Sequence, residues 1–309
     1  MLKNLARDWS AEGRAERSEA YEPMLEELET LVPICSDGST FRPDVLIPGA
    51  GLGRMCLEAV RRGYNAQGSE FSYFMLLASS FMLNSSSPAE PLVVHPWIHT
   101  SLNHLSDESM LREVLCPEVD PVEHAGNTDA TMSMCAGDFV EVYTKAEQEN
   151  SWDAILSCFF LDTAQNFVDY LEAMYNALKP GGVLINFGPL LFHWAEHASE
   201  MASNDISIEA SWETVKSVAL QVGFHIRREE MRWCTYTTDR NSMLQSMYNV
   251  VFATFVKPTN GPRRVYSNAA AMQGIPQHRD SANTEQPNGD PNERKSVDHQ
   301  NKHHYEGDR

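Results

Sequence analysis

The feature that most constrains this chain is a glycine-rich turn that follows a short apolar run. Residues 45–48 are apolar, and the turn after them carries glycine at every second position, Gly49, Gly51 and Gly53. A second short strand is predicted at residues 64–68, and an acid, Glu70, comes just after it. Glycines allow the backbone to approach a ligand closely, and an acid so placed accepts hydrogen bonds from ribose hydroxyls. The pattern therefore predicts a nucleoside-cofactor site in an open α/β sheet.

Two cofactors suit such a site, a nicotinamide dinucleotide and S-adenosyl-L-methionine. The dinucleotide fingerprint places its third glycine one residue later than Gly53, where it helps to seat a pyrophosphate on the helix N-terminus. After the strand predicted at residues 132–136, Asp138 can hydrogen-bond an adenine edge and Phe139 can cover the adenine face. Both features favour S-adenosyl-L-methionine.

Alternating strand and helix patterns predict the fold. Strands are expected at residues 45–47, 64–68, 132–136, 152–160, 183–187, 224–231 and 248–256, with helices at 53–62, 72–83, 164–178 and 212–222. Such alternation is typical of α/β folds with a mainly parallel sheet and helices on both faces. A Pro-Gly-Gly turn at 180–182 before a strand, and the final pair of strands, favour the seven-stranded sheet of a Rossmann-like class I methyltransferase.

The chain is expected to divide into three parts. Residues 1–35 form an N-terminal helical segment, since large apolar side chains recur there at roughly helical spacing. Residues 36–258 form the methyltransferase domain, with an insertion or long loop at about 84–131, where prolines interrupt the alternation. Residues 259–309 are rich in Asn, Gln, Pro and Gly and nearly lack large aliphatic side chains, which predicts a disordered tail.

Charge and composition exclude some partners and locations. The net charge is −19, so neither nucleic acid nor an anionic membrane surface is expected as a partner. No apolar run approaches the roughly 18 residues of a transmembrane helix, and the first residues lack the apolar core of a signal peptide. The six cysteines are scattered, which predicts reduced thiols in a cytoplasmic protein, with the nucleus as an alternative location. No metal site is expected, because histidines such as His303 and His304 have no structured partner.

Short motifs along residues 4–258 resemble those of one enzyme family, the carnosine N-methyltransferases. In chain order they are PGAGLGR at 48–54, QGSEFS at 67–72, PWIH at 96–99, AGDF at 136–139, CFFLDTA at 158–164, NFGPLLFH at 186–193 and SIE at 207–209. The resemblance implies transfer of a methyl group from S-adenosyl-L-methionine to the imidazole ring of carnosine, a β-alanyl-histidine dipeptide, which gives anserine. A small imidazole dipeptide is therefore the expected partner of the site.

The resemblance also implies roles for individual residues. The cofactor contacts, together with Gly51 of the glycine turn, are Arg7, Gly49, Glu70, Asp138, Phe139 and Cys158. The substrate contacts are Asp162, His193, Tyr236 and Tyr248. The chain departs from the family pattern at Asn4, where the family has glutamine, and most of the family's longer N-terminal helical region is absent from it. Because of that short region, both a homodimer and a monomer stay open.

Among these residues, Asp162 is the one that we expect to act in catalysis. A neutral imidazole has one bare nitrogen and one N–H, and a carboxylate that accepts this N–H turns the other lone pair towards the methyl group. The carboxylate also offsets the positive charge that grows on the ring. Asp162 and His193 each follow a predicted strand, at the sheet edge where ligands of open α/β sheets bind.

The residues alone leave simpler interpretations open. Asp162 could cap the helix that follows it, and His193 could be a structural histidine. Tyr236 and Tyr248 could be core aromatics, and Arg7 could be a solvated charge on its helix. Two other functions also stay open: methylation of a histidine in a peptide or protein, and a catalytically inactive binding protein that keeps the fold.

Overall fold

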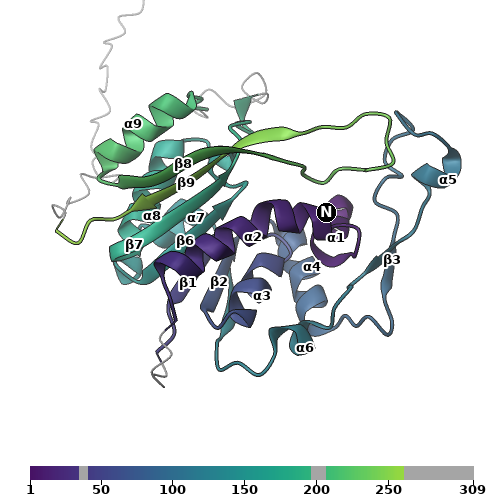
Figure 1. Cartoon of the computed structure of the whole chain (residues 1–309), viewed down its shortest axis with the longest axis horizontal. Coiled ribbons are helices and arrows are strands. Elements are labelled where there is room, and N and C mark those ends of the chain that lie inside the picture. The colour runs from purple at the N-terminus through teal and green to yellow at the C-terminus, as the bar shows by residue number, and fades with distance from the viewer. Residues whose placement is uncertain (35–40, 196–206, 261–309) are drawn as a thin grey trace, which may run out of the picture. The chain divides into compact units, whose positions relative to one another are not determined.

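Seven strands form the central sheet of the protein (Figure 1). The computed structural model describes residues 1–34, 41–195 and 207–260. Across the sheet the strands stand in the order β5 (Met132–Ala136), β2 (Asn65–Glu70), β1 (Asp44–Pro48), β6 (Trp152–Cys158), β7 (Leu178–Gly188), β9 (Tyr248–Val256) and β8 (His225–Cys234). Neighbouring strands run parallel, except that β9 is antiparallel to both β7 and β8. The predicted α/β class, with its Rossmann-like methyltransferase sheet, is confirmed.

Helices cover both faces of this sheet, because successive side chains of a strand point to opposite sides. In β1, Val45 and Ile47 pack into one apolar cluster, whereas Leu46 packs into another on the opposite face. The first cluster also contains residues of α2 (Arg14–Leu31) and α3 (Arg54–Arg61), and the second contains residues of α7 (Phe139–Tyr143), α8 (Phe167–Ala177) and α9 (Trp212–Val222). Burial on both faces explains why β1 is a continuous apolar run.

The N-terminal segment consists of two helices, α1 (Leu2–Trp9) and α2, where the sequence predicted one continuous helical stretch. The break includes Gly13, where a Cβ would lie only 2.1 Å from the carbonyl oxygen of Arg7. Just before the break, Trp9 is buried with Leu52 of the glycine turn in a third apolar cluster. The Trp9 indole N–H also donates to the Leu52 carbonyl over 3.2 Å. The break therefore lets α1 pack against the glycine turn, which one continuous helix would not do.

The expected insertion at about 84–131 contains short regular elements. These are β3 (Leu92–Val94), α5 (Asp107–Met110), β4 (Val114–Cys116) and α6 (Pro121–Ala125), and β3 pairs with β4 in an antiparallel two-stranded sheet. Val94, Val114 and Cys116 pack in the same apolar cluster as Trp9. The segment is therefore more than an irregular loop, because its apolar side chains support α1.

The remaining elements complete the connections. α4 (Tyr73–Asn84) follows β2, and two short 3-10 helices, η1 (Ala146–Gln148) and η2 (Leu161–Thr163), flank β6. α8 begins later than its predicted start at residue 164, since Asn166 caps it by accepting the N–H of Val168. Among the helices of the described ranges, none has the length and apolar composition to cross a membrane. From residue 261 onwards, the tail that the sequence predicted lies outside the described residues.

The order of the strands places the ligand crevice at the ends of β1 and β6. From β1 the chain moves to β2 and β5 on one side, whereas β6 and β7 lie on the other side. Open α/β sheets bind ligands outside the carboxyl ends of the strands at such a reversal. The glycine turn follows β1, and Phe159 and Phe160 follow β6, so both segments border this crevice.

Candidate active site

The glycine turn after β1 and the acid at the end of β2 are joined by a hydrogen bond. Gly49 and Gly51 have φ of +64° and +55°, values that residues with side chains rarely adopt. One oxygen of the Glu70 carboxylate accepts the N–H of Gly51 at 2.9 Å, and the other accepts the N–H of Ser72 at 2.8 Å. Glu70 therefore holds the glycine turn in shape and places a carboxylate beside it.

A cavity of about 980 Å³ opens at this edge of the sheet. Its wall includes five of the residues that the sequence predicted for the site, Gly49, Glu70, Asp138, Phe139 and His193. Asp138 also caps α7, since its side chain accepts the N–H of Glu141 at 2.9 Å. The cavity lies near the top of the range of volumes that hold drug-sized ligands, roughly 300–1,000 Å³. It therefore has room for a nucleoside and part of a second molecule.

Aromatic rings line one wall of this cavity. Phe160 stacks on Tyr170, with ring centroids 4.6 Å apart and planes inclined by 14°. Phe139 meets Phe160 edge-on at a centroid distance of 5.1 Å. A Cβ on Gly49 would lie 2.6 Å from the Phe160 ring, so glycine is what lets this ring reach the turn. Together the rings offer the apolar surface that a planar base needs.

Arg7 is buried in a second group of site side chains. Only 6% of it is exposed, and its guanidinium donates to Asp8 at 2.9 Å and to the Tyr21 hydroxyl at 2.8 Å. The guanidinium carbon lies 4.9 Å from the ring centroid of Tyr21 and 4.7 Å from that of Tyr236. The interpretation of Arg7 as a solvated helix charge is wrong, because the packing of α1 encloses its side chain.

Cys158 ends β6 beside Arg7. Burial raises the pKa of the Cys158 thiol to about 11, although the charge of Arg7 and a hydrogen bond from it act in the opposite direction. A thiol with such a pKa stays protonated near neutral pH and is a poor nucleophile. Cys158 is therefore suited to a packing contact with a ligand.

Tyr236 and Tyr248 meet at Phe159, the first residue after β6. Phe159 has φ of +51°, a conformation that a bulky residue keeps only when its surroundings impose it. Its ring stacks on Tyr236 at 4.5 Å and meets Tyr248 edge-on at 5.9 Å. Burial raises the pKa of the Tyr236 hydroxyl, which also bonds the side chain of Asn4. Both tyrosines are half-buried, so each keeps part of its surface at the sheet edge.

Asp162 lies in η2 and is only 2% exposed. Its carboxylate accepts the N–H of Leu191 at 2.9 Å, and its main-chain carbonyl accepts the N–H of His193 at 3.0 Å. Burial raises the pKa of the Asp162 carboxyl, while the Leu191 N–H and the charge of His193 act in the opposite direction. The interpretation of Asp162 as the cap of the next helix is wrong, because Asn166 caps α8.

The predicted site residues thus form two groups that meet after β6. Five of them line the cavity. Gly51 is joined to this group through its hydrogen bond to Glu70, and Asp162 through His193. The others gather around Phe159 and the ring stacked on it, namely Arg7, Cys158, Tyr236 and Tyr248. Phe159 and Phe160 are consecutive, so the two groups share one edge of the sheet.

Several residues of this site were missed at the level of sequence. The predicted strand over 152–160 included Phe159 and Phe160, whereas β6 ends at Cys158 and both rings pack in the site. Tyr21, which bonds Arg7, was treated only as part of a helix. The CFFLDTA motif could have indicated the two phenylalanines, but no local pattern relates Tyr21 to Arg7.

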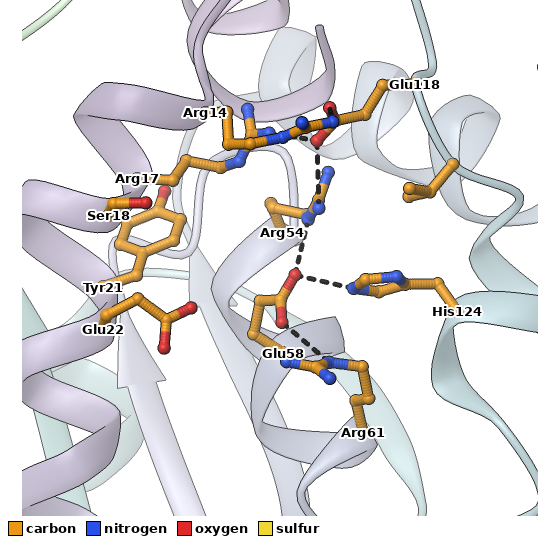
Figure 2. A pocket seen from close by; sticks show the side chains of 11 residues that line it. Arg14, Arg17, Ser18, Tyr21, Glu22, Arg54, Glu58, Arg61, Glu118 and His124 are labelled. Atoms are coloured by element: carbon orange, nitrogen blue, oxygen red, sulfur yellow. Dashed lines mark hydrogen bonds and ion pairs between the residues drawn. The ribbon is translucent and has the colours of Figure 1, made fainter. Parts of the chain in front are cut away.

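A second cavity, of about 250 Å³, lies between α2, α3 and α6 and is lined mainly by charged side chains (Figure 2). Glu118 accepts from Arg14 at 2.8 Å and from Arg54 at 3.3 Å. Glu58 accepts from Arg54 at 3.0 Å, and the His124 ring nitrogen lies 2.7 Å from it. Burial alone would raise the pKa of Glu58, but Arg54 and His124 lower it to about 2. Because these charges compensate one another, we assign them to holding α2, α3 and α6 together.

Candidate metal ligands and cysteine thiols were compared across the described residues. In this part of the chain, no group of three or more His, Cys, Asp and Glu side chains is placed to hold a metal ion. Five cysteines of the described ranges are free thiols, three of them buried. His303 and His304 lie outside the described residues.

Comparison with known proteins adds the family. A family model described as carnosine N-methyltransferase matches residues 1–259 of the chain. The chain belongs to the carnosine N-methyltransferase family. The resemblance that the motifs indicated over residues 4–258 is thereby confirmed, and all of the site residues described above lie inside the match.

Relatives in the carnosine N-methyltransferase family are longer than this chain. It is 41% identical to the carnosine N-methyltransferase of Mus musculus over 258 residues. The aligned residues make up 83% of this chain and 62% of the mouse protein. It is 39% identical to the carnosine N-methyltransferase of Dictyostelium discoideum over 262 residues, and this alignment covers 84% of this chain and 54% of the relative. Among solved structures, the magnesium protoporphyrin IX methyltransferase of Synechocystis superposes with a TM-score of 0.44 at 12% identity, over 79% of this chain and 86% of that chain.

Proposed function

We propose that this chain transfers a methyl group from S-adenosyl-L-methionine to an imidazole nitrogen of carnosine, or of a related histidine dipeptide. The observation that carries the proposal is the buried Asp162 joined to His193, at the edge of a cavity that Glu70 and Asp138 also line. Membership of the carnosine N-methyltransferase family supports it. With carnosine as the acceptor, the product would be anserine.

The residues of the cavity suit S-adenosyl-L-methionine. Glu70 would accept hydrogen bonds from the ribose hydroxyls, and Asp138 would bond the adenine edge while Phe139 covers its face. Arg7 would pair with the carboxylate of the methionine part, beside Cys158. When bound, this cofactor supplies a methyl group on a sulfonium centre.

The side chains of the protein itself would prepare the acceptor ring. The Asp162 carboxylate would accept the N–H of the imidazole nitrogen that is not methylated and so present the lone pair of the other nitrogen. As positive charge grows on the ring, the same carboxylate would offset it in a setting of low dielectric. We assign His193, Tyr236 and Tyr248 to substrate contacts at the same sheet edge.

A competition assay tests the proposed acceptor. The chain is incubated with labelled S-adenosyl-L-methionine and equal concentrations of carnosine, free histidine and a short histidine-containing peptide, and the products are identified by mass spectrometry. We expect most of the label in methylated carnosine. Label mainly in the peptide would instead favour a peptide or protein histidine as the acceptor.

The alternative of an inactive binding protein needs a separate measurement. Calorimetric titration with S-adenosyl-L-methionine is expected to show saturable binding by the wild-type chain. The methyltransferase proposal would be overturned if the titration showed no heat of binding and no acceptor gave a labelled product.

We further propose that the chain forms a homodimer through α4. Four large side chains on this helix are 69%, 74%, 53% and 46% exposed, namely Tyr73, Phe74, Leu77 and Phe81. Residues 71–88 contain no charged residue in a chain of net charge −19, so two copies can meet here without opposing like charges. Light scattering should report a dimer for the wild type and a monomer for a Phe74→Ser, Leu77→Ser variant. A monomeric wild type would overturn the proposal.

A further inference from the structure

Glu16 of α2 contacts both Arg7 and the turn that follows Tyr236. It is 4% exposed, and its two carboxylate oxygens accept the N–H groups of Thr237 and Thr238, each at 2.8 Å. The oxygen that bonds Thr237 also lies 3.8 Å from the Nε of Arg7. One buried carboxylate therefore connects α1, α2 and the segment after β8.

The turn that Glu16 holds has an unfavourable backbone conformation. Thr237 has φ of +48°, a left-handed value that a β-branched residue rarely adopts. The residue before it is Tyr236, whose ring stacks on Phe159 and lies over the guanidinium of Arg7. Hydrogen bonds to a charged acceptor are about twice as strong as neutral ones, and two of them hold this turn. The position of the Tyr236 ring thus depends on Glu16.

The same segment has other attachments, which offer a comparison. The connection from β8 to β9 runs past the N-terminal helix towards α5 (Figure 1). At its far end, Asp239 pairs with Arg112 of the insertion at 3.0 Å. Near the sheet, Glu19 of α2 accepts the N–H and the hydroxyl of Thr235, both at 2.9 Å. Glu16 differs from these attachments because it also approaches a guanidinium within the site.

We propose that Glu16 is a positioning residue that sets Arg7 and Tyr236 together, so that the cofactor side and the acceptor side of the site form as one unit. An ionised carboxylate can accept two main-chain N–H groups and attract a guanidinium at the same time. Glutamine keeps the shape but has one acceptor oxygen and no charge. The inference rests on the proposed methyl transfer, because that proposal makes Arg7 and Tyr236 the cofactor and substrate contacts.

The test compares Glu16→Gln with Glu19→Gln in the full chain. Both variants remove a carboxylate with which α2 holds the same connection, and only the first acts next to Arg7. For Glu16→Gln we expect the Kd of S-adenosyl-L-methionine and the KM for carnosine each to rise about tenfold, with kcat changed by less than about twofold. For Glu19→Gln we expect both constants to stay within about twofold of the wild type. Equal effects of the two variants, or a loss of kcat alone, would overturn the inference.

Thr237→Gly separates the two contacts of Glu16 and guards against a folding defect. Glycine adopts a positive φ without strain, so it should restore the turn in the Glu16→Gln background. We expect the double variant to recover the KM for carnosine to within about threefold of the wild type, while the Kd of S-adenosyl-L-methionine stays raised about tenfold. The inference would be overturned if the double variant recovered neither the KM nor the Kd although its unfolding temperature equalled that of the wild type. A wild-type chain that binds no S-adenosyl-L-methionine would instead overturn the proposed function, and this role with it.

Discussion

The main-chain N–H of His193 donates to the main-chain carbonyl of Asp162 over 3.0 Å, and this bond joins the segments that follow β7 and β6. The first segment also supplies the Leu191 N–H, which the Asp162 carboxylate accepts at 2.9 Å. Two hydrogen bonds therefore hold Asp162 against the segment that carries His193, beside the cavity. A carboxylate that aligns an acceptor ring must itself be fixed, and this pairing fixes it.

Asp162→Asn should separate catalysis from binding. Asparagine keeps the shape and can accept the Leu191 N–H, but it cannot offset a positive charge on the ring. We expect kcat to fall about 100- to 1,000-fold, while the Kd of S-adenosyl-L-methionine stays within about twofold. Steady-state kinetics and calorimetry measure the two effects, with the exposed Asp107→Asn as a matched control. Unchanged turnover would remove Asp162 from its proposed role.

The same variant should be more stable than the wild type near pH 7. Burial raises the pKa of the Asp162 carboxyl, so its ionised form is disfavoured in the folded state. The free-energy cost of keeping this carboxyl ionised in the folded state is absent at pH values below its ordinary pKa. It is present in full once the pH exceeds the raised pKa, so it lowers the stability of the wild type there. Asparagine carries no charge, so the unfolding temperature at pH 7 should rise. A lower unfolding temperature, measured by circular dichroism, would contradict this.

Arg7→Gln should weaken the binding of S-adenosyl-L-methionine and leave the rate of methyl transfer at saturation nearly unchanged. If Arg7 pairs with the cofactor carboxylate as proposed, loss of this buried guanidinium should raise the Kd of S-adenosyl-L-methionine about 30-fold, with kcat at saturation within about threefold. Arg227→Gln on β8 is a matched control, because Arg227 is exposed. An unchanged Kd would show that Arg7 serves the fold alone.

Glu70→Gln should also weaken the binding of S-adenosyl-L-methionine. Glutamine retains one acceptor oxygen, so it cannot accept from both the Gly51 and the Ser72 N–H groups and also bond the ribose. We expect the Kd of S-adenosyl-L-methionine to rise about tenfold or more, as measured by calorimetry. The exposed Glu141→Gln should bind as the wild type does. If Glu70→Gln did so too, the ribose contact would be excluded.

Glu58 in the second cavity should make stability depend on acid pH. Its folded-state pKa is lowered from 4.5 to about 2, which corresponds to about 3 kcal/mol in favour of the folded, ionised state. This contribution is present in full above the ordinary pKa and is lost as the pH falls towards the lowered value. Glu58→Gln should therefore reduce the free energy of unfolding in urea by about 3 kcal/mol at pH 7, and by less than about half of that at about pH 3. A difference that stayed constant between these pH values would contradict the assignment.

Local patterns were sufficient for several elements of the fold. α9 (Trp212–Val222) and β9 (Tyr248–Val256) begin and end at the residues that periodicity predicted, because each pattern lies within one element. The break at Gly13 was not predictable in this way. It depends on how closely the glycine approaches the carbonyl of Arg7, and only the folded chain brings the two together.

By itself the sequence determined which chemical groups stand at the edge of the sheet. Gly49, Glu70, Asp138 and Asp162 each come at or just after the end of a parallel strand, and the carboxyl ends of such strands meet at one edge. What only the tertiary structure decided is the surroundings of Arg7. A buried guanidinium needs partners that offset its lost hydration. Besides the neighbouring Asp8, these are Tyr21 of α2 and Tyr236 after β8, which are distant in sequence.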